Sequence, residues 1–486
     1  MPETRFESVI GLEVHIQLNT LSKAFCGDDA SFGGSPNSHT SVISLAHPGT
    51  LPKINKKQVE YAIRLGLALQ CEINENNYFD RKHYFYADLP KGFQTTQDNQ
   101  PICKGGHLLL RKKDGTRKIR IHHIHMEEDA GKSLHHLHPS ASLLDFNRAG
   151  VPLLELVTEP ELHNSEEVYI FINQLRQLVR YLEISDGNME EGSLRCDVNV
   201  SIRPKGTKEL NNRCEIKNIN SARFARKAVD YEIVRQIAII ERGEVVKQQT
   251  REYIPEEDKT RALRGKEHAH DYRYFPEPDL PPVVLLKNFI DRLKKTQPEL
   301  PDAKILRFQS TYELSLYDAE LLAEQKEIAR EYEDIIDSFS VAPKPLANVF
   351  INKILPYLSE QEITIHNFPL SYQQLVDFLH LIEDKKITTS IAYQQLWPVL
   401  LENPGDVNQT AVSLNILQTS DEDQIMEIAR VVVIDNPEQV KKYLQGKKSL
   451  MGFFMGQLMR KSNGKANPKI AQRALQNCLE EIEKAD

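Results

Sequence analysis

The chain has 486 residues, of which 40% are hydrophobic and 27% charged, a composition typical of a soluble globular protein with about three domains. No apolar run approaches the length of a membrane span and residues 1–3 open no signal peptide, which argues against a membrane-spanning or secreted protein. The net charge is −8, and the six cysteines show no CxxC spacing, so we expect reduced thiols and a cytoplasmic location.

Strictly alternating segments predict half-buried strands. Between residues 10 and 18 the apolar side chains occupy the even positions, and Glu13 and His15 lie between them. Residues 194–203 repeat this alternation, and a shorter segment of the same kind ends at Lys217. A period of two is typical of antiparallel strands with one buried face. Two interpretations of the polar face stay open: it meets water, or it lines a charged cleft for phosphates and metal.

Residues 84–94, with the sequence YFYADLPKGFQ, combine four aromatic residues with Lys91. Such a segment suits stacking on a terminal adenosine with a charge contact to a phosphate, and it equally suits a packed aromatic turn. A cluster of six histidines follows, which we interpret as polar surface because no pair of thiolates accompanies it to form a zinc site. These are His122, His123, His125, His135, His136 and His138.

Carboxylates gather in residues 125–160. Glu127, Glu128 and Asp129 precede a Gly-Lys-Ser turn, and Glu155 stands alone in the apolar run LLELV. A charge in such a run is costly to bury unless it is paired or bound to a metal ion, and converging carboxylates suit Mg²⁺. Adjacent residues of an extended chain point to opposite faces, so only one of Glu127 and Glu128 need enter the cleft. The turn is not a P-loop, because that motif needs glycine where this chain has Met126.

Breaks in the pattern divide the second half of the chain. The Pro-rich stretch 275–282 interrupts helix and strand, residues 303–397 are mostly helical in pattern, and Asn-Pro-Gly at 403–405 marks a second break. We therefore expect domains over residues 1–295, 296–402 and 403–486. Nine basic residues and no acidic one lie between 441 and 473. This window is either a surface that binds RNA or a solvated lysine-rich helix.

Seven motifs between residues 11 and 282, in this order, resemble those of the B subunit family of tRNA-dependent amidotransferases. They are GLEVH, YFYADLPKGFQ, HMEEDAGKS, DFNRAGVPLLELV, GNMEEGSLRCDVN, EIKNINS and DYRYFPEPDLPP. LMGFFMGQLMRKSNGKANP, residues 450–468, resembles the tail domain of the same family. The resemblance implies an α+β fold, in which a glutamine-synthetase-like antiparallel-sheet cradle is followed by an all-α helical domain and a small α-helical tail that contacts tRNA.

The resemblance also implies a ligase that uses ATP and Mg²⁺ to convert Glu-tRNA(Gln) to Gln-tRNA(Gln), Asp-tRNA(Asn) to Asn-tRNA(Asn), or both. The chain carries no recognisable glutaminase signature. The resemblance places glutamine hydrolysis in an A subunit that supplies ammonia, and a small C subunit completes the complex. A stand-alone amide ligase acting on a free amino acid and a non-catalytic tRNA-binding scaffold are the alternatives.

The resemblance assigns roles to individual residues. It favours Glu128 over Glu127, and it implies Mg²⁺ ligands at Glu13, His15, Glu128 and Glu155. Whether His15 binds the metal directly or orients a ligand stays open. Further candidates are Arg195 and Lys217 as phosphate clamps, Lys91, Glu191 and Asp197 as ATP contacts or orienting groups, and Lys447, Lys448, Arg460, Lys461 and Lys465 as RNA contacts.

One loop departs from the family pattern. Many relatives hold a structural zinc with four cysteines in the segment that corresponds to residues 25–48, but this chain keeps Cys26 alone. Asp28, Ser41 and Ser44 stand where the partners are expected, and none of them supplies a thiolate. His39 and His47 could join Cys26 and Asp28, but such a mixed ligand set is uncommon. We expect a zinc-free loop ordered by its own hydrogen bonds.

Overall fold

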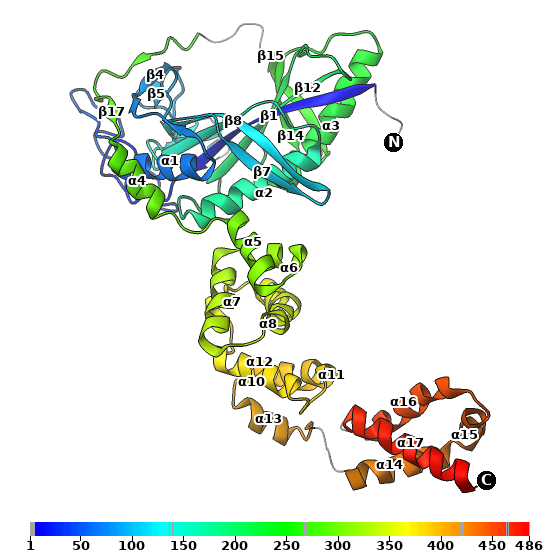
Figure 1. Ribbon diagram of the computed structural model, residues 1–486. Coiled ribbons are helices and arrows are strands. Elements are labelled where there is room, and N and C mark those ends of the chain that lie inside the picture. Colours follow the sequence, from blue (N-terminus) through cyan, green and yellow to red (C-terminus); the bar gives the residue numbers. More distant parts are fainter. Residues whose placement is uncertain are drawn as a thin grey trace. The chain divides into compact units, whose positions relative to one another are not determined.

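The computed structural model describes residues 5–135, 137–138, 140–265, 271–417, 422–462, 464 and 466–485. The chain divides into two compact units, Met1–Lys304 and Ile305–Asp486. Strands and helices are mixed in the first unit, whereas the described part of the second unit is helical (Figure 1). The coarse expectation of a mixed α and β region followed by a helical C-terminal region is confirmed.

A ten-stranded sheet forms the centre of the first unit. Its strand order is β15-β14-β13-β12-β1-β11-β8-β6-β2, and β7 pairs with β8 outside this path. Every pairing is antiparallel, as expected, except that β13 and β14 run parallel. The strands are β1 (Phe6–Gln17), β2 (Glu72–Ile73), β6 (Cys103–Lys104), β7 (His107–Lys112), β8 (Gly115–Glu128), β11 (Pro152–Thr158), β12 (Leu194–Pro204), β13 (Cys214–Lys217), β14 (Gln249–Ile254) and β15 (Lys259–Gly265).

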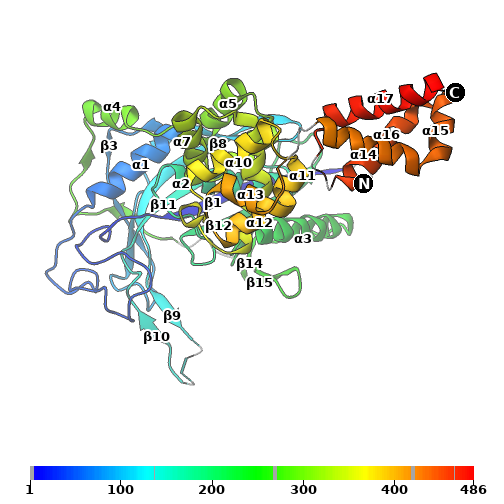
Figure 2. The same ribbon diagram turned by 90° about the horizontal axis from the view of Figure 1, so that it is seen from below.

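The first unit also contains three smaller sheets. A three-stranded sheet has the order β16-β4-β5, and two pairs join β9 with β10 and β3 with β17. The β9–β10 hairpin projects from the first unit (Figure 2). These strands are β3 (Asn76–Asn77), β4 (Asp80–His83), β5 (Phe93–Thr96), β9 (Lys132–Leu134), β10 (Leu143–Asp145), β16 (Phe275–Pro276) and β17 (Val283–Val284).

The alternation predicted for β1 and β12 is confirmed. Leu12, Val14 and Ile16 are buried on one face of β1, while Glu13 and His15 are only half-buried on the other. β12 repeats the pattern with buried Leu194 to Val200 at even positions. Because neighbouring strands are in register, the apolar sides merge into one core and the polar sides form a continuous face.

Helices α1 (Lys56–Ala68), α2 (Ser165–Tyr181) and α3 (Ala222–Glu241) pack on the apolar side of this sheet (Figure 1). Each begins at a residue whose side-chain oxygen accepts hydrogen bonds from backbone N–H groups of the first turn, namely Asn55, Asn164 and Ser221. α4 (Lys287–Lys295) completes the helices that lie wholly in this unit. The polar side of the sheet is thus left for the candidate functional residues.

The described part of the second unit contains two apolar clusters, one between Ile305 and Ile416 and one between Ile425 and Leu479. None of the helices in the described residues has the length and apolar character needed to span a membrane. The helices are α5 (Pro301–Tyr312), α6 (Leu316–Leu322), α7 (Lys326–Phe339), α8 (Pro343–Val349), α9 (Leu355–Glu360), α10 (Tyr372–Glu383), α11 (Thr389–Ile391), α12 (Trp397–Glu402), α13 (Val407–Ser413), α14 (Glu422–Asp435), α15 (Pro437–Leu444), α16 (Met451–Lys461) and α17 (Pro468–Ala485). Shorter π-helical and 3₁₀ segments are η1 (Phe350–Ile354), η2 (Ile365–Asn367), η3 (Ala392–Leu396) and η4 (Lys448–Leu450).

Candidate active site

Four neighbouring strands bring charged side chains into one row across the polar face of the sheet. The register places His125 of β8 opposite Glu155 of β11, Glu155 opposite His15 of β1, and His15 opposite Arg195 of β12. These residues lie far apart in the sequence, and only the strand order brings them together. Three of the four are residues that the sequence marked as candidates.

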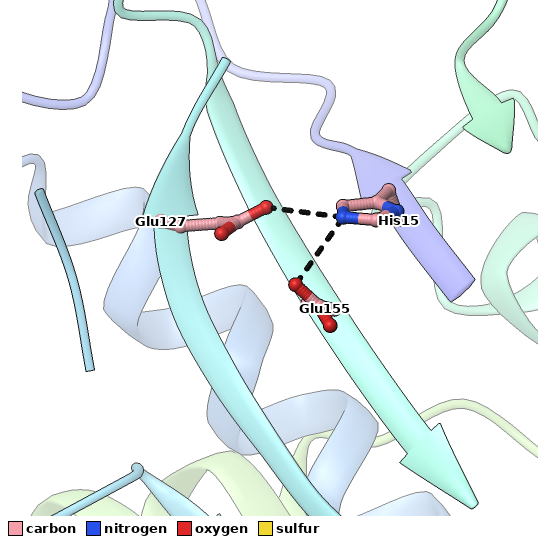
Figure 3. Close-up of side chains that lie close together, drawn as sticks. All are labelled: His15, Glu127 and Glu155. Atoms are coloured by element: carbon pink, nitrogen blue, oxygen red, sulfur yellow. Dashed lines mark ion pairs between the residues drawn. The ribbon is translucent and has the colours of Figure 1, made fainter. Parts of the chain in front are cut away.

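His15, Glu127 and Glu155 form the tightest group in this row (Figure 3). His15 Nε2 lies 3.2 Å from Glu155 Oε2 and 3.5 Å from Glu127 Oε1. One ligand atom from each of the three residues lies within 4.8 Å of the others. Glu127 is 1% exposed, and among the described residues its Oε1 atom has no hydrogen-bond donor. A buried carboxylate oxygen without a donor is costly unless a cation completes its contacts.

His125 supports both carboxylates from the neighbouring position. Its Nε2 atom lies 3.5 Å from Glu127 and 3.4 Å from Glu155. Burial alone would lower the pKa of His125, but the two carboxylates outweigh burial and raise it to about 10. For His15 the same opposing effects raise the pKa to about 9. In the absence of another cation, protonated imidazoles therefore balance the buried carboxylate charge.

A second acidic group lies on the neighbouring strands. Glu13, Asp197 and Glu215 have carboxylate oxygens within 4.8 Å of one another. Lys217 Nζ lies 2.6 Å from Asp197 and 3.2 Å from Glu215, and Asn199 donates to Glu13 over 3.0 Å. Burial raises the pKa of Glu13, and the nearby Glu155, Asp197 and Glu215 raise it further. Lys217 therefore balances part of the negative charge of this group, and a divalent cation would neutralise it further.

Arg195 is held at the edge of the His15 group by a buried carboxylate. Its Nη1 atom lies 2.9 Å from Asp129 Oδ2, and Arg148 Nε approaches the same oxygen to 3.5 Å. Burial would raise the pKa of Asp129, but Arg195 and Arg148 more than offset that effect and lower it. Asp129 therefore fixes two guanidinium groups beside the row, where they can bind anionic oxygens.

Glu128 points away from the His15 group. It is ion-paired with Lys91 and accepts a hydrogen bond of 2.9 Å from the backbone N–H of Thr95. Lys91 and Glu128 line a cavity of about 230 Å³ that also includes Lys23 and Arg81. The structure thus groups Glu127, and not the expected Glu128, with His15 and Glu155. Lys91, expected as an ATP contact, is ion-paired with Glu128.

Both groups fit Mg²⁺ by the chemistry of their donors. Mg²⁺ prefers carboxylate oxygens and usually binds through one or two of them with water filling the other positions. The His15 group offers two carboxylates and an imidazole, and the Glu13 group offers three carboxylates. Among the described residues, Glu127 Oε1 accepts no hydrogen bond and has only the ion pair with His15 at 3.5 Å, which favours the His15 group as the position of a metal ion.

The remaining candidates lie elsewhere. Glu191 is exposed in the turn before β12, and no ion pair among the described residues includes it. Lys447, Lys448, Arg460 and Lys461 are exposed in the described part of the tail, with Lys461 Nζ 2.8 Å from Asp435. Lys465 and His136 lie outside the described residues. The interpretation of the histidine cluster as polar surface is wrong for His125, which is 8% exposed.

Sequence reasoning missed His125, Glu127 and Asp129. The alternation of residues along β8 could have identified two of them, because buried Ile124 and Met126 lie on the same face of the strand as Glu128. His125 and Glu127 take the opposite, polar face by the same rule. Asp129 follows the end of the strand, so this rule gave no information about it.

Two family models match nearly the whole chain. The GatB/GatE catalytic domain model matches residues 8–291 and the GatB domain model residues 330–479. A relative from Persephonella marina is 44% identical over 98% of this chain and 99% of its own length. Relatives from Thermodesulfovibrio yellowstonii and Geotalea uraniireducens are 44% and 45% identical, over 98% and 97% of this chain and 100% and 98% of their own. All three are named as the B subunit of an aspartyl/glutamyl-tRNA(Asn/Gln) amidotransferase. The chain therefore belongs to the GatB/GatE family, as its motifs predicted.

Proposed function

We propose that this protein is the activating subunit of a tRNA-dependent amidotransferase. It would use ATP to phosphorylate the side-chain carboxylate of Glu-tRNA(Gln), Asp-tRNA(Asn) or both, and ammonia would then convert the product to the amide. The relatives are named for aspartyl and glutamyl tRNA substrates. The observation that carries the proposal is the row in which His15, Glu127 and Glu155 adjoin a second acidic group and two cations, Arg195 and Lys217.

The chemistry explains why such a row is needed. A carboxylate is a poor electrophile because an attacking amine meets negative charge and no leaving group. Transfer of the γ-phosphoryl group creates an acyl phosphate, from which ammonia displaces phosphate. Mg²⁺ held by His15, Glu127 and Glu155, with Glu13, Asp197 and Glu215 for a second ion, would neutralise charge on the phosphate oxygens.

The chain's own cations complete the site. Arg195, fixed by Asp129, would donate its remaining N–H groups to phosphoryl oxygens, and Lys217 would turn from Asp197 to an incoming phosphate. His125 holds the Glu127 and Glu155 carboxylates in position through its Nε2 atom. Lys91 and Glu191, expected at the nucleotide, do not join this row, and we leave them outside the proposed machinery.

The proposal extends to the surroundings of the site. The large sheet would be a glutamine-synthetase-like cradle within a domain of residues 1–295, followed by a helical domain over 296–402 and a tRNA-binding tail over 403–486. A glutaminase A subunit would supply ammonia and a C subunit would complete a cytoplasmic complex. Lys447, Lys448, Arg460, Lys461 and Lys465 would contact the tRNA backbone.

Reconstitution with its partner subunits tests the proposal. The complex is expected to form Gln-tRNA(Gln) from Glu-tRNA(Gln), or the asparaginyl product, only with ATP, Mg²⁺ and glutamine or ammonium. Activity on free glutamate without tRNA would instead favour a stand-alone amide ligase. Binding of tRNA without tRNA-dependent ATP hydrolysis would favour a scaffold, and either result overturns the proposal.

A further inference from the structure

Three histidine rings form a continuous series along β8 that leads from the surface of the sheet to the acidic row. They are His122, which is exposed, His123, which is half-buried, and His125, which is 8% exposed. Among the described residues, the Glu127 and Glu155 carboxylates form ion pairs with His125 but with neither of the other two rings. His122 and His123 can therefore act on the row only through His125.

An irregularity in the pairing of β8 with β11 explains why two adjacent histidines meet. The register pairs Ile121 and His123 with consecutive residues of β11, so His122 is an extra residue of β8 at this point. Adjacent side chains of a regular strand point to opposite faces, and a bulge of one residue interrupts this alternation. The bulge thus brings the His122 ring beside His123, which already shares a face with His125.

Nitrogen atoms join the three rings. His122 Nδ1 lies 2.7 Å from His123 Nδ1, and His123 Nε2 lies 3.0 Å from His125 Nδ1. The ring planes of His123 and His125 are only 17° apart, with centroids at 5.1 Å. An imidazole N–H points outward in the plane of its ring, and the lone pair of the other nitrogen does the same. Nearly parallel planes therefore suit a hydrogen bond between these two rings.

His123 uses both of its nitrogens within the series. Burial and the neighbouring His125 and His122 rings lower the pKa of His123 to about 4, so the ring is neutral at pH 7. A neutral imidazole has one N–H donor and one acceptor nitrogen. Because each nitrogen of His123 faces a nitrogen of another ring, one of them donates and the other accepts.

The contact with His123 is the shorter of the two anchors of the His125 ring. On its other side, His125 Nε2 lies 3.5 Å from Glu127 and 3.4 Å from Glu155, beyond the usual length of an N–H···O hydrogen bond. Turning the ring over would exchange Nε2 for Cε1 at the carboxylates and Nδ1 for Cδ2 at His123. The 3.0 Å bond to His123 opposes this turn, because a carbon would take the place of Nδ1.

The orientation of His125 matters because its Nε2 atom contacts both carboxylates of the His15 group. Glu127 is contacted by His125 through Oε2 and by His15 through Oε1. Glu155 Oε2 lies near Nε2 of the same two histidines. Residues that orient the ligands of a metal ion without binding it typically change metal affinity by about 10- to 100-fold when they are lost.

We propose that His123 is a positioning residue of the metal site. Its Nε2 atom fixes the His125 ring with Nε2 toward Glu127 and Glu155, and both carboxylates are thereby held where a divalent cation binds. His122 gives His123 its second partner at the surface, where water can also serve. The inference deepens the proposed function and rests on it for the role of the metal ion, which is to bind the phosphates of ATP.

Three substitutions separate the hydrogen bond of His123 from the space that its ring fills. His123→Phe keeps a ring but has no nitrogen, and His123→Leu has neither ring nor nitrogen. His123→Gln places an amide near the position of Nε2, and this amide can donate or accept. His107→Phe, at a half-buried histidine of the neighbouring strand β7, is the matched control.

Two measurements are made on each variant. Mn²⁺ binding to the full-length chain is followed by electron paramagnetic resonance, and the His15 group is identified as the site whose affinity falls in Glu127→Gln. Amidation of aminoacyl-tRNA by the reconstituted complex is measured over a range of Mg²⁺ concentrations. Thermal unfolding of each variant checks the fold.

His123→Phe and His123→Leu are expected to weaken Mn²⁺ binding at the His15 group by about 10-fold or more. His123→Gln and His107→Phe should remain near wild type. Amidation by the Phe and Leu variants should fall at limiting Mg²⁺ and recover at saturating Mg²⁺. A ring that only filled space would give the opposite order, because Phe would replace it better than Gln.

The outcomes separate this inference from the proposed function. Unchanged Mn²⁺ affinity in His123→Phe and His123→Leu would overturn the inference, and the proposed function would stand if the complex amidates aminoacyl-tRNA. A loss in His123→Gln as large as in His123→Phe, or the absence of Mn²⁺ binding at the His15 group of wild type, would overturn it as well. If the variants rank as expected but wild type amidates no aminoacyl-tRNA, the proposed function fails while the positioning of the metal site by His123 stands.

Discussion

Glu127 and Glu128 are adjacent in β8, yet their carboxylates belong to different groups. Glu127 Oε1 lies 3.5 Å from His15 Nε2 on the polar face of the sheet. Glu128 lies on the opposite side of the strand, where it is ion-paired with Lys91 and bonded to the Thr95 N–H. The pleat of one strand thus places one carboxylate in the His15 group and the other beside Lys91.

Glu127→Gln is therefore expected to weaken Mg²⁺ binding at the His15 group far more than Glu128→Gln. Loss of a direct ligand should cost at least about 100-fold in affinity, the upper end of what loss of an outer-sphere partner costs. Calorimetric titration with Mg²⁺, or Mn²⁺ titration followed by electron paramagnetic resonance, measures this in each variant. Glu155→Gln should behave as Glu127→Gln does. An unchanged affinity in Glu127→Gln, or a loss confined to Glu128→Gln, would contradict the assignment.

The strands of the site could be predicted from the sequence because alternation is a local property. The period of two in β1 and β12 placed Glu13, His15, Arg195 and Asp197 correctly on a polar face. The apolar residues Ile124 and Met126 also indicate that Glu127, and not Glu128, lies on the polar face of β8, but the family resemblance favoured Glu128. Local patterns were thus sufficient to decide which face a side chain occupies.

The partners of these residues could not be predicted in the same way. His15 and Glu155 are neighbours because β11 inserts between β1 and β8 in the sheet, and strand order is set by tertiary packing rather than by any one segment. Arg195 meets Asp129 for the same reason. Glu191 was a candidate because it lies in an acidic motif after Glu190, but the turn before β12 leaves its side chain exposed and outside the row.

The buried carboxylate of Glu232 on α3 should make stability depend on pH. It is fully buried and accepts hydrogen bonds from Arg235 Nε over 2.9 Å and Gln236 Nε2 over 2.8 Å. Burial alone would raise its pKa, but these partners and Arg251 bring it below the usual value of 4.5. The stabilisation is therefore complete above that usual value and is lost as the pH falls through the lower pKa of the folded state.

Glu232→Gln is expected to lower the free energy of unfolding at pH 7 by about 3–5 kcal/mol, because Arg235 and Arg251 are left without their counter-charge. The difference from wild type should shrink as the pH falls below the usual value of 4.5 and through the lower pKa of the folded state, because the wild-type carboxylate then becomes protonated. Urea unfolding at several pH values measures both effects. Glu244→Gln, at an exposed pair with Arg242, is the control that should change little. A constant difference at every pH would refute this account.

Binding of tRNA should depend more on Lys447 and Lys448 than on Lys461. All three are exposed, but Lys461 Nζ is 2.8 Å from Asp435, which already balances its charge. Each lost phosphate contact should reduce the slope of log K against log salt by about 0.7–0.9. Filter binding of Lys447→Ala, Lys448→Ala and Lys461→Ala over a range of salt tests this, with Lys344→Ala as an exposed control. Equal slopes in wild type and the tail variants would show that the basic residues between 441 and 473 form a solvated surface and do not bind RNA.

The loop that contains Cys26 is expected to be ordered without zinc. Ser44 Oγ donates to Asp28 Oδ2 over 2.5 Å and accepts from the Ser41 N–H over 3.0 Å, so the three positions expected for zinc ligands bond to one another instead. Burial raises the pKa of Cys26 to about 11, which keeps it a thiol at neutral pH, whereas zinc binds the thiolate. Protein purified without chelator should contain no stoichiometric zinc by elemental analysis.

Ser44→Ala should lower the free energy of unfolding by about 1 kcal/mol, because a part-buried hydrogen bond to a carboxylate is lost, whereas Cys26→Ser should leave stability and metal content unchanged. One zinc per chain that disappears in Cys26→Ser would show instead that Cys26 binds the metal with Asp28, His39 or His47.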